Sequence, residues 1–162
     1  MRIAVLGYSG SGKTYISNYI SQKQSIPVLH LDAIKYDKEW RPINNELVLP
    51  LVSDFLEKDD WIIDGYYKNL LLEERLNKAD LLILMQLPRL TCLWSVIKRS
   101  KERTREGYVN DLNWWFVKFT LFGCRNKARR NSYAEIAEKY KDKIIVLKTR
   151  QQVNKFLFHF GS

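Results

Sequence analysis

The 162-residue sequence has few of the residues that build disulfide frameworks and metal sites. Its two cysteines, Cys92 and Cys124, lie far apart, and its two histidines are not clustered. Without a C-x-x-C pair or a Cys/His cluster, neither a disulfide framework nor a zinc site is indicated. No apolar run approaches the length of a membrane span, and the first predicted strand leaves no room for a signal peptide. We therefore expect a cytoplasmic protein with no membrane partner.

The chain is long enough to bury a core as one domain. Its hydrophobic fraction is 46% and it contains five tryptophans, which agrees with a packed globule. No internal repeat, linker or low-complexity tract divides it. We predict a single domain over residues 1–162.

The formal net charge of +9 is concentrated in one segment. Residues 1–97 hold eleven basic side chains against twelve acidic ones, and residues 131–162 hold six against three. Residues 98–130 hold ten against three. Such a cluster can bind nucleic acid or a membrane surface, or it can grip the phosphates of a small molecule. The charge alone does not choose between these partners.

The segment from Gly7 to Thr14 fits the pattern G-x-x-x-x-G-K-[ST] at every fixed position, between an apolar run and a stretch that can be helical. Its glycines let the backbone fold around a phosphate with successive N–H groups pointing inward, and the following helix adds the positive end of its dipole. Lys13 would reach the outer phosphates, and the Thr14 hydroxyl would ligate Mg²⁺. The predicted binding residues are Gly7, Ser9, Gly10, Ser11, Gly12, Lys13 and Thr14.

Strands alternate with helices along the chain. The apolar runs predict strands over 2–6, 26–31, 61–63, 81–85 and 144–147. Helices are predicted over 13–24, 46–58 after a cap at Asn44 or Asn45, 70–77, 89–105, from a cap at Ser132 to about 141, and 151–158. This alternation predicts an α/β fold, a parallel sheet covered on both faces.

Two acids end predicted strands: Asp32 the second and Asp64 the third. In an open parallel sheet, ligands bind beyond the carboxyl ends of the strands, where the phosphate loop also lies. One acid could be a general base for an acceptor hydroxyl, and one could hold Mg²⁺ directly or through water. Alternatively, Asp32 could cap the next turn and Asp64 could form an Asx turn with Gly65.

The basic segment could supply a lid. Phosphoryl transfer needs positive charge around the moving group, and an arm that closes over the site can bring it while expelling water. Arg99 and Arg103 share a helix face, Arg105 follows them, and Arg125 and Arg129 are again four residues apart. The alternative is a solvated basic surface.

Residues 112–123 are unusual in holding five aromatic side chains. The simplest interpretation of Trp114 to Phe122 is an amphipathic helix packed on the body of the protein or on another subunit. An aromatic platform for a nucleobase is the second interpretation.

The order of these motifs resembles that of the bacterial DNA topology modulation proteins, small relatives of adenylate kinase among the P-loop nucleoside and nucleotide kinases. The motifs are the phosphate loop, His30-Leu31-Asp32, Trp40-Arg41-Pro42, Trp61 to Tyr66, Ala79-Asp80, Leu87-Pro88-Arg89 and the paired arginines. The resemblance covers essentially the whole chain. It implies a three-layer P-loop fold with a five-stranded parallel sheet of order 2-3-1-4-5, ATP with Mg²⁺, and a helical basic lid over 98–130.

The same resemblance implies residue roles. Asp64 would orient the water shell of the metal beside Thr14, and Arg99 and Arg103 would clasp phosphates. Residues 146–151 would border the adenine ring. The implied catalytic residues are Lys13, Asp32, Asp64, Arg99 and Arg103. Arg105 and Arg150 join the implied nucleotide contacts, and Asp32, Arg41, Asp64 and Tyr66 would surround an acceptor.

One departure from those relatives bears on activity. Gln86 stands where they commonly place an acid, so metal binding would shift to Thr14 with Asp32 or Asp64. The leading interpretation is a kinase that moves the γ-phosphoryl group of ATP to a small, nucleotide-like or hydroxylated acceptor. The alternatives are an ATP-binding regulator that contacts DNA or RNA through residues 98–130 and a nucleotide-binding switch that has lost transfer.

Overall fold

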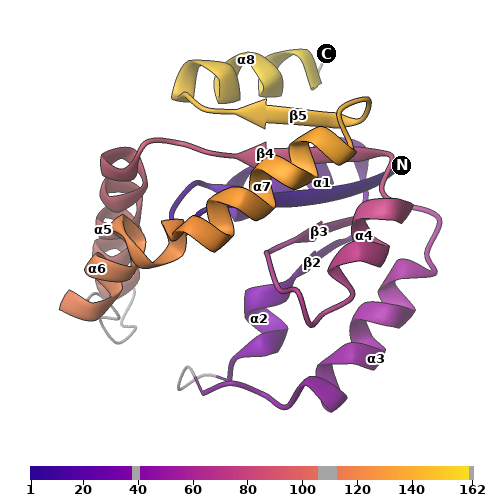
Figure 1. Ribbon diagram of the computed structural model, residues 1–162, viewed down its shortest axis with the longest axis horizontal. Helices are drawn as coiled ribbons and strands as arrows, with labels where there is room; N and C mark the ends of the chain where they lie inside the picture. The colour runs from indigo at the N-terminus through magenta and orange to yellow at the C-terminus, as the bar shows by residue number, and fades with distance from the viewer. Residues whose placement is uncertain (38–40, 106–112, 161–162) are drawn as a thin grey trace.

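Five parallel strands form one sheet of order β2-β3-β1-β4-β5 (Figure 1). The computed structural model describes residues 1–37, 41–105 and 113–160, without the side chains of 102–105. The strands are β1 (Arg2–Gly7), β2 (Val28–His30), β3 (Trp61–Asp64), β4 (Leu81–Met85) and β5 (Ile144–Leu147). The predicted fold class and strand order are confirmed.

Helices connect the strands and cover both faces of the sheet. They are α1 (Lys13–Gln24), α2 (Leu31–Lys35), α3 (Asn45–Leu56), α4 (Leu72–Lys78), α5 (Arg89–Arg105), α6 (Trp114–Leu121), α7 (Lys127–Lys139) and α8 (Arg150–Phe160), with a 3₁₀ turn η1 (Gly123–Arg125). Within the described ranges, none of them combines the length and the apolar character needed to cross a membrane.

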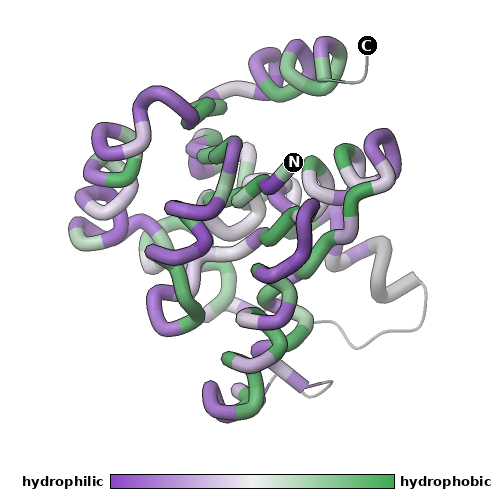
Figure 2. The backbone as a smooth tube through the Cα atoms, turned by 90° about the vertical axis from the view of Figure 1, so that its right-hand side faces the viewer, coloured by the Kyte–Doolittle hydropathy of each residue, from purple (hydrophilic) through white to green (hydrophobic). Residues whose placement is uncertain are grey.

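The alternation of side chains along each strand divides the core into two layers. Ile3 and Val5 of β1 belong to the layer that α1 and α8 cover, whereas Ala4 and Leu6 belong to the layer that α3, α4 and α7 cover. Such double burial explains the nearly continuous apolar runs of the strands. The helices alternate between hydrophilic and hydrophobic residues along their turns, as expected when one face is buried (Figure 2).

Several predicted boundaries were wrong: β2 begins at Val28 rather than 26, α3 ends at Leu56 rather than 58, and α4 begins at Leu72 rather than 70. The second strand ends at His30, because its partner β3 ends at Asp64, the residue that pairs with His30, and Leu31 then starts α2. The seventh helix begins at Lys127 because the Asn126 side chain caps it by accepting a hydrogen bond from the N–H of Arg129.

Asn44 caps α3, as predicted, by accepting from the N–H of Glu46. Trp114–Leu121 is helical, but Thr120 is buried while both tryptophans are exposed, so the tryptophans do not take part in the predicted packing on the body of the protein. The predicted break at 107–111, Trp40 and Leu112 lie outside the described residues.

A fully buried arginine fixes the loop that follows β3. Arg75 of α4 donates to the carbonyl oxygens of Gly65, Tyr67 and Leu70 at 3.1, 2.9 and 2.9 Å. Burial lowers the pKa of its guanidinium to about 10, which still leaves it charged at neutral pH. The cation therefore replaces the water that three loop carbonyls would otherwise need.

We expect Arg75→Met to lower the free energy of unfolding by about 3 kcal/mol or more, since three buried carbonyl oxygens lose their donor. Urea unfolding followed by circular dichroism measures this. Arg130→Met, on the exposed surface of α7, is the matched control and should change stability by no more than about 0.5 kcal/mol. Equal losses in the two variants would contradict this role for Arg75.

Candidate active site

The phosphate loop lies between the end of β1 and the start of α1. Gly10 and Gly12 have left-handed backbone angles, with φ of 71° and 92°. A Cβ on Gly10 would overlap the carbonyl oxygen of Cys92 and lie 2.7 Å from a methyl group of Val96, and a Cβ on Gly7 would lie 2.5 Å from the carbonyl oxygen of Met85. The loop therefore packs directly against the end of β4 and against α5, which only glycine permits here.

Several hydrogen-bond donors converge on this loop. Among the described residues no side chain caps α1 at Gly12, and its first turn holds no acid, so the positive end of the helix dipole is left open to an anion. The Lys13 ammonium donates to the carbonyl of Tyr8 at 3.1 Å, across the loop. The Ser11 hydroxyl is 2% exposed and has no hydrogen-bond partner among the described residues. This donor set fits the phosphates of a nucleotide.

The chemistry of the donors also fits Mg²⁺ bound mainly through phosphates. No group of three or more His, Cys, Asp or Glu side chains in the described part of the chain could hold a metal alone. Mg²⁺ usually keeps several waters and takes only one or two protein ligands beside substrate phosphates. Thr14, exposed in the first turn of α1, and Asp64 could supply these.

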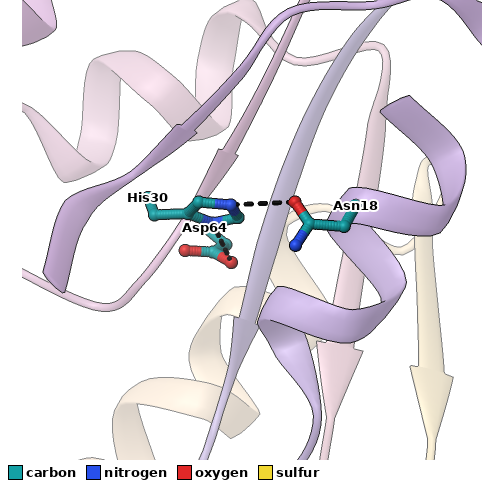
Figure 3. A network of polar contacts seen from close by, with 3 residues as sticks. All are labelled: Asn18, His30 and Asp64. Atoms are coloured by element: carbon teal, nitrogen blue, oxygen red, sulfur yellow. Dashed lines mark hydrogen bonds and ion pairs between the residues drawn. The ribbon is translucent and has the colours of Figure 1, made fainter. Parts of the chain in front are cut away.

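Asp64 lies at the end of β3, 3% exposed, in a network that crosses three segments (Figure 3). Its Oδ2 lies 2.9 Å from Nδ1 of His30, whose Nε2 lies 2.9 Å from Oδ1 of Asn18 on α1. Asn18 is one helical turn after Thr14, on the same face of α1. The network thus fixes the Asp64 carboxylate relative to the phosphate-binding helix.

The His30 ring is held between two oxygen atoms. A neutral imidazole donates from only one nitrogen, so this arrangement suits the doubly protonated ring, whereas a neutral ring requires the Asn18 amide to turn over. The hydrogen bond to Asp64 raises the pKa of His30 above its ordinary 6.5, against the opposing effect of burial. The N–H of Gly65 donates to the carbonyl oxygen of Val5 at 3.1 Å.

Asp32 lies in the first turn of α2, exposed, and accepts a hydrogen bond from the Tyr67 hydroxyl at 2.5 Å. Burial and the Asp32 charge raise the pKa of Tyr67, so the phenol stays protonated and remains a donor. Tyr66 points elsewhere. Its hydroxyl lies 2.7 Å from that of Ser132 on α7.

Two arginines of the basic segment lie on tyrosine rings beside the phosphate loop. The Arg125 guanidinium lies 4.0 Å from the ring of Tyr8, and Nη2 donates to the carbonyl of Leu87 at 2.7 Å and to Cys92 Sγ at 3.1 Å. The Arg129 guanidinium lies 3.8 Å from the ring of Tyr66. The sequence predicted only that Arg125 and Arg129 share a helical spacing of four residues. It gave no indication of their aromatic partners.

Tyr133 joins the two rings. Its ring packs 5.2 Å from Tyr8 and 5.2 Å from Tyr66, and burial raises its pKa to about 12. Its hydroxyl is buried without a partner among the described residues. These three tyrosines therefore link the phosphate loop, the loop after β3 and α7 in one cluster.

The remaining predicted residues are more dispersed. Arg99 lies three residues after Val96 and seven after Cys92, on the face of α5 that meets Gly10. Arg150 donates to the Ser95 hydroxyl at 2.6 Å and so joins α8 to α5. Gln86 follows β4, and its N–H donates to the carbonyl of Leu147 at 2.8 Å.

Among the described residues, Arg41 contacts Asp37 and none of the other predicted acceptor residues. Its Nε donates to Asp37 Oδ2 at 2.7 Å within the turn that joins α2 to α3, and its side chain is 72% exposed. The predicted acceptor set of Asp32, Arg41, Asp64 and Tyr66 is therefore joined by no direct contact that we observe. The side chains of Arg103 and Arg105 lie outside the described part of the structure.

Comparisons with solved structures identify the fold. The chain is similar to a kinase-like protein from Chloroflexus aurantiacus (14% identity, TM-score 0.57, 97% of this chain and 94% of that one covered). It is similar to the shikimate kinases of Aquifex aeolicus (19%, 0.51, 98% and 95%) and Bacteroides thetaiotaomicron (14%, 0.52, 98% and 95%). At these identities the similarity shows the P-loop kinase fold alone.

Sequence comparisons add no family. No family model matches the chain, and no curated protein matches it. The resemblance to DNA topology modulation proteins therefore stays a hypothesis.

The loop glycines differ in what surrounds them, which gives a test. At Gly12 a Cβ would meet only the terminal methyl of Met85 at 3.7 Å, so Gly12→Ala should cost only the left-handed backbone strain of about 1–2 kcal/mol. Gly10→Ala adds overlap with the Cys92 backbone and should cost clearly more. Urea unfolding of both variants checks the order, and a smaller loss for Gly10→Ala would contradict the packing described.

His30 predicts a pH dependence of stability. Because its folded pKa is raised, its contribution is complete below the unfolded pKa of about 6.5 and is lost as pH rises through the folded pKa. The difference in unfolding free energy between the wild type and His30→Gln should therefore shrink as the pH rises above about 6.5. Asp64→Asn should bring the NMR-measured pKa of His30 down. An unchanged pKa would contradict the cause assigned here.

Proposed function

We propose that this protein is an ATP-dependent kinase that transfers the γ-phosphoryl group to a hydroxyl of a small, nucleotide-like or hydroxylated acceptor, with Mg²⁺ as cofactor. The observation that carries the proposal is the phosphate loop itself. Its left-handed glycines, a helix start and a Ser11 hydroxyl that have no side-chain partner in the described part of the chain form a donor-lined turn at the carboxyl end of the central strand.

Lys13 would bind the phosphates, and Thr14 and Asp64 would bind the metal. Mg²⁺ would supply positive charge that neutralises the phosphates during transfer. Lys13, which donates to the Tyr8 carbonyl, would turn to the outer phosphates, and Thr14 and Asp64 would hold the metal. Gln86 carries no charge, which is compatible with metal binding by Thr14 and Asp64 alone.

Asp32 is the proposed general base. It is exposed, lies one residue beyond the β2–α2 junction at the carboxyl edge of the sheet, and is oriented by the Tyr67 hydroxyl. The acceptor would lie between Asp32 and the Tyr66–Arg129 pair. Arg99, on the α5 face that meets the phosphate loop, and the predicted lid residues Arg103 and Arg105 would stabilise the transferring phosphoryl group.

Lys13→Ala should reduce ATP-dependent phosphoryl transfer about 10²- to 10³-fold, because the developing charge loses its cation. An ADP-release screen with Mg-ATP across nucleosides, nucleoside monophosphates and small polyols identifies the acceptor, and the variant is then assayed on the hit. Lys23→Ala, at the other end of α1, is the matched control. Unchanged turnover in Lys13→Ala would refute the proposal, as would the absence of any heat from Mg-ATP in calorimetry.

The DNA-binding alternative makes a different prediction. Binding through charge weakens steeply with salt, so a gel-shift titration at low salt tests it directly. Acceptor-independent, slow ATP turnover would instead favour a nucleotide-binding switch.

A further inference from the structure

Helices α5 and α6 carry an unusual number of exposed apolar side chains. They contact each other and stand together at one end of the molecule, on the left in Figure 1. We call residues 89–101 and 113–122 the α5–α6 arm. Its exposed apolar side chains, from 60% to 76% accessible, are Leu90, Trp94, Trp114, Trp115 and Phe122. Large apolar side chains exposed on two helices that contact each other are typical of an interaction surface.

The same arm is entirely basic in its charge. It contains no acid and five cations, Arg89, Lys98, Arg99, Lys101 and Lys118. Two of these cations lie against the exposed rings: Lys118 Nζ is 5.3 Å from the ring of Trp114, and the Arg89 guanidinium is 5.3 Å from that of Phe122. Positive charge therefore borders the apolar surface rather than lying apart from it.

The helical spacing separates this surface from the phosphate loop. Cys92 and Val96 of α5 meet Gly10, whereas Leu90 and Trp94, followed by Lys98 and Lys101, lie one above another on the exposed side. On α6, Thr120 is buried and the tryptophans face outward. A partner bound to the outer surface would leave the contact between α5 and the phosphate loop in place.

We infer that the α5–α6 arm binds the surface of an anionic lipid bilayer. Interfacial helices combine Trp, Phe and Leu, which enter the boundary between headgroups and acyl chains, with Lys and Arg, which attract anionic headgroups. The arm has both components on two adjacent helices. This peripheral contact needs no spanning segment, and it does not depend on the proposed kinase activity.

Other occupants fit less well. A second copy on the same surface would bring the exposed lysines of both copies, Lys98, Lys101 and Lys118, close to one another. Single-stranded nucleic acid is bound by stacking bases on open ring faces. Here one face of the Trp115 ring is stacked on Phe119 at 5.3 Å, Lys118 lies over Trp114, and Leu90 offers no ring. A mixed aliphatic and aromatic surface suits acyl chains better.

Vesicle co-sedimentation with the full chain tests the inference. Vesicles of phosphatidylglycerol and phosphatidylcholine should bind the protein, pure phosphatidylcholine vesicles should bind it weakly, and tryptophan fluorescence should shift to the blue on binding. Trp114→Ala/Trp115→Ala should weaken partitioning about tenfold or more, and Lys98→Gln/Lys101→Gln should weaken binding to anionic vesicles selectively. Phe158→Ala/Lys155→Gln, on the exposed face of α8, is the matched control and should bind as the wild type does.

Three results would overturn the inference. The first is no binding to anionic vesicles at low salt. The second is full binding by both arm variants, with circular dichroism confirming that they are folded. The third is binding of a single-stranded oligonucleotide, or self-association, that is lost in the arm variants while vesicle binding is absent. Loss of phosphoryl transfer in Lys13→Ala tests only the kinase proposal, so the two can fail separately.

Discussion

The close contact between the phosphate loop and the start of α5 is the constraint on which the site depends. Gly10 lies so near the backbone of Cys92 that no side chain fits, and Gly7 lies equally near Met85 at the end of β4. Because β1 pairs with both β3 and β4 in parallel, the ends of all three strands meet at the same edge. Because Gly7 and Gly10 have no side chain, α1, Asp64 and the arginine-bearing face of α5 can come together at this edge.

The parts of this arrangement that depend on local pattern could be predicted from the sequence. Glycine spacing identified the loop, and alternation of apolar runs with helical periodicity identified the parallel sheet. Boundaries were less predictable, since partners decide them. β2 stops where β3 offers no further pairing, and Asn126 and Ser132 are both good caps in sequence although only Asn126 precedes a helix.

The contacts that orient the candidate catalytic groups could not be predicted, because they join residues far apart in the chain. His30 bridges Asn18 and Asp64, which are 12 and 34 positions away. Arg75 resembles any helical arginine in sequence, yet it is fully buried because its three acceptors lie in a loop that folds back on it. Burial of a cation depends on such acceptors, and only the tertiary structure shows where they are.

The basic segment, which looks uniform in the sequence, is divided by the chemistry of its side chains. Guanidinium groups are planar and weakly hydrated, so they can leave water and stack on aromatic rings, whereas ammonium groups hold their water strongly. Arg125 and Arg129 lie half-buried on Tyr8 and Tyr66 beside the phosphate loop, while Lys98, Lys101 and Lys118 are exposed on the α5–α6 arm, where Lys118 lies against the Trp114 ring. A high local charge therefore does not define one partner here: the half-buried arginines would suit the phosphorylated small molecule that we propose, and the exposed lysines would suit the anionic bilayer that we infer.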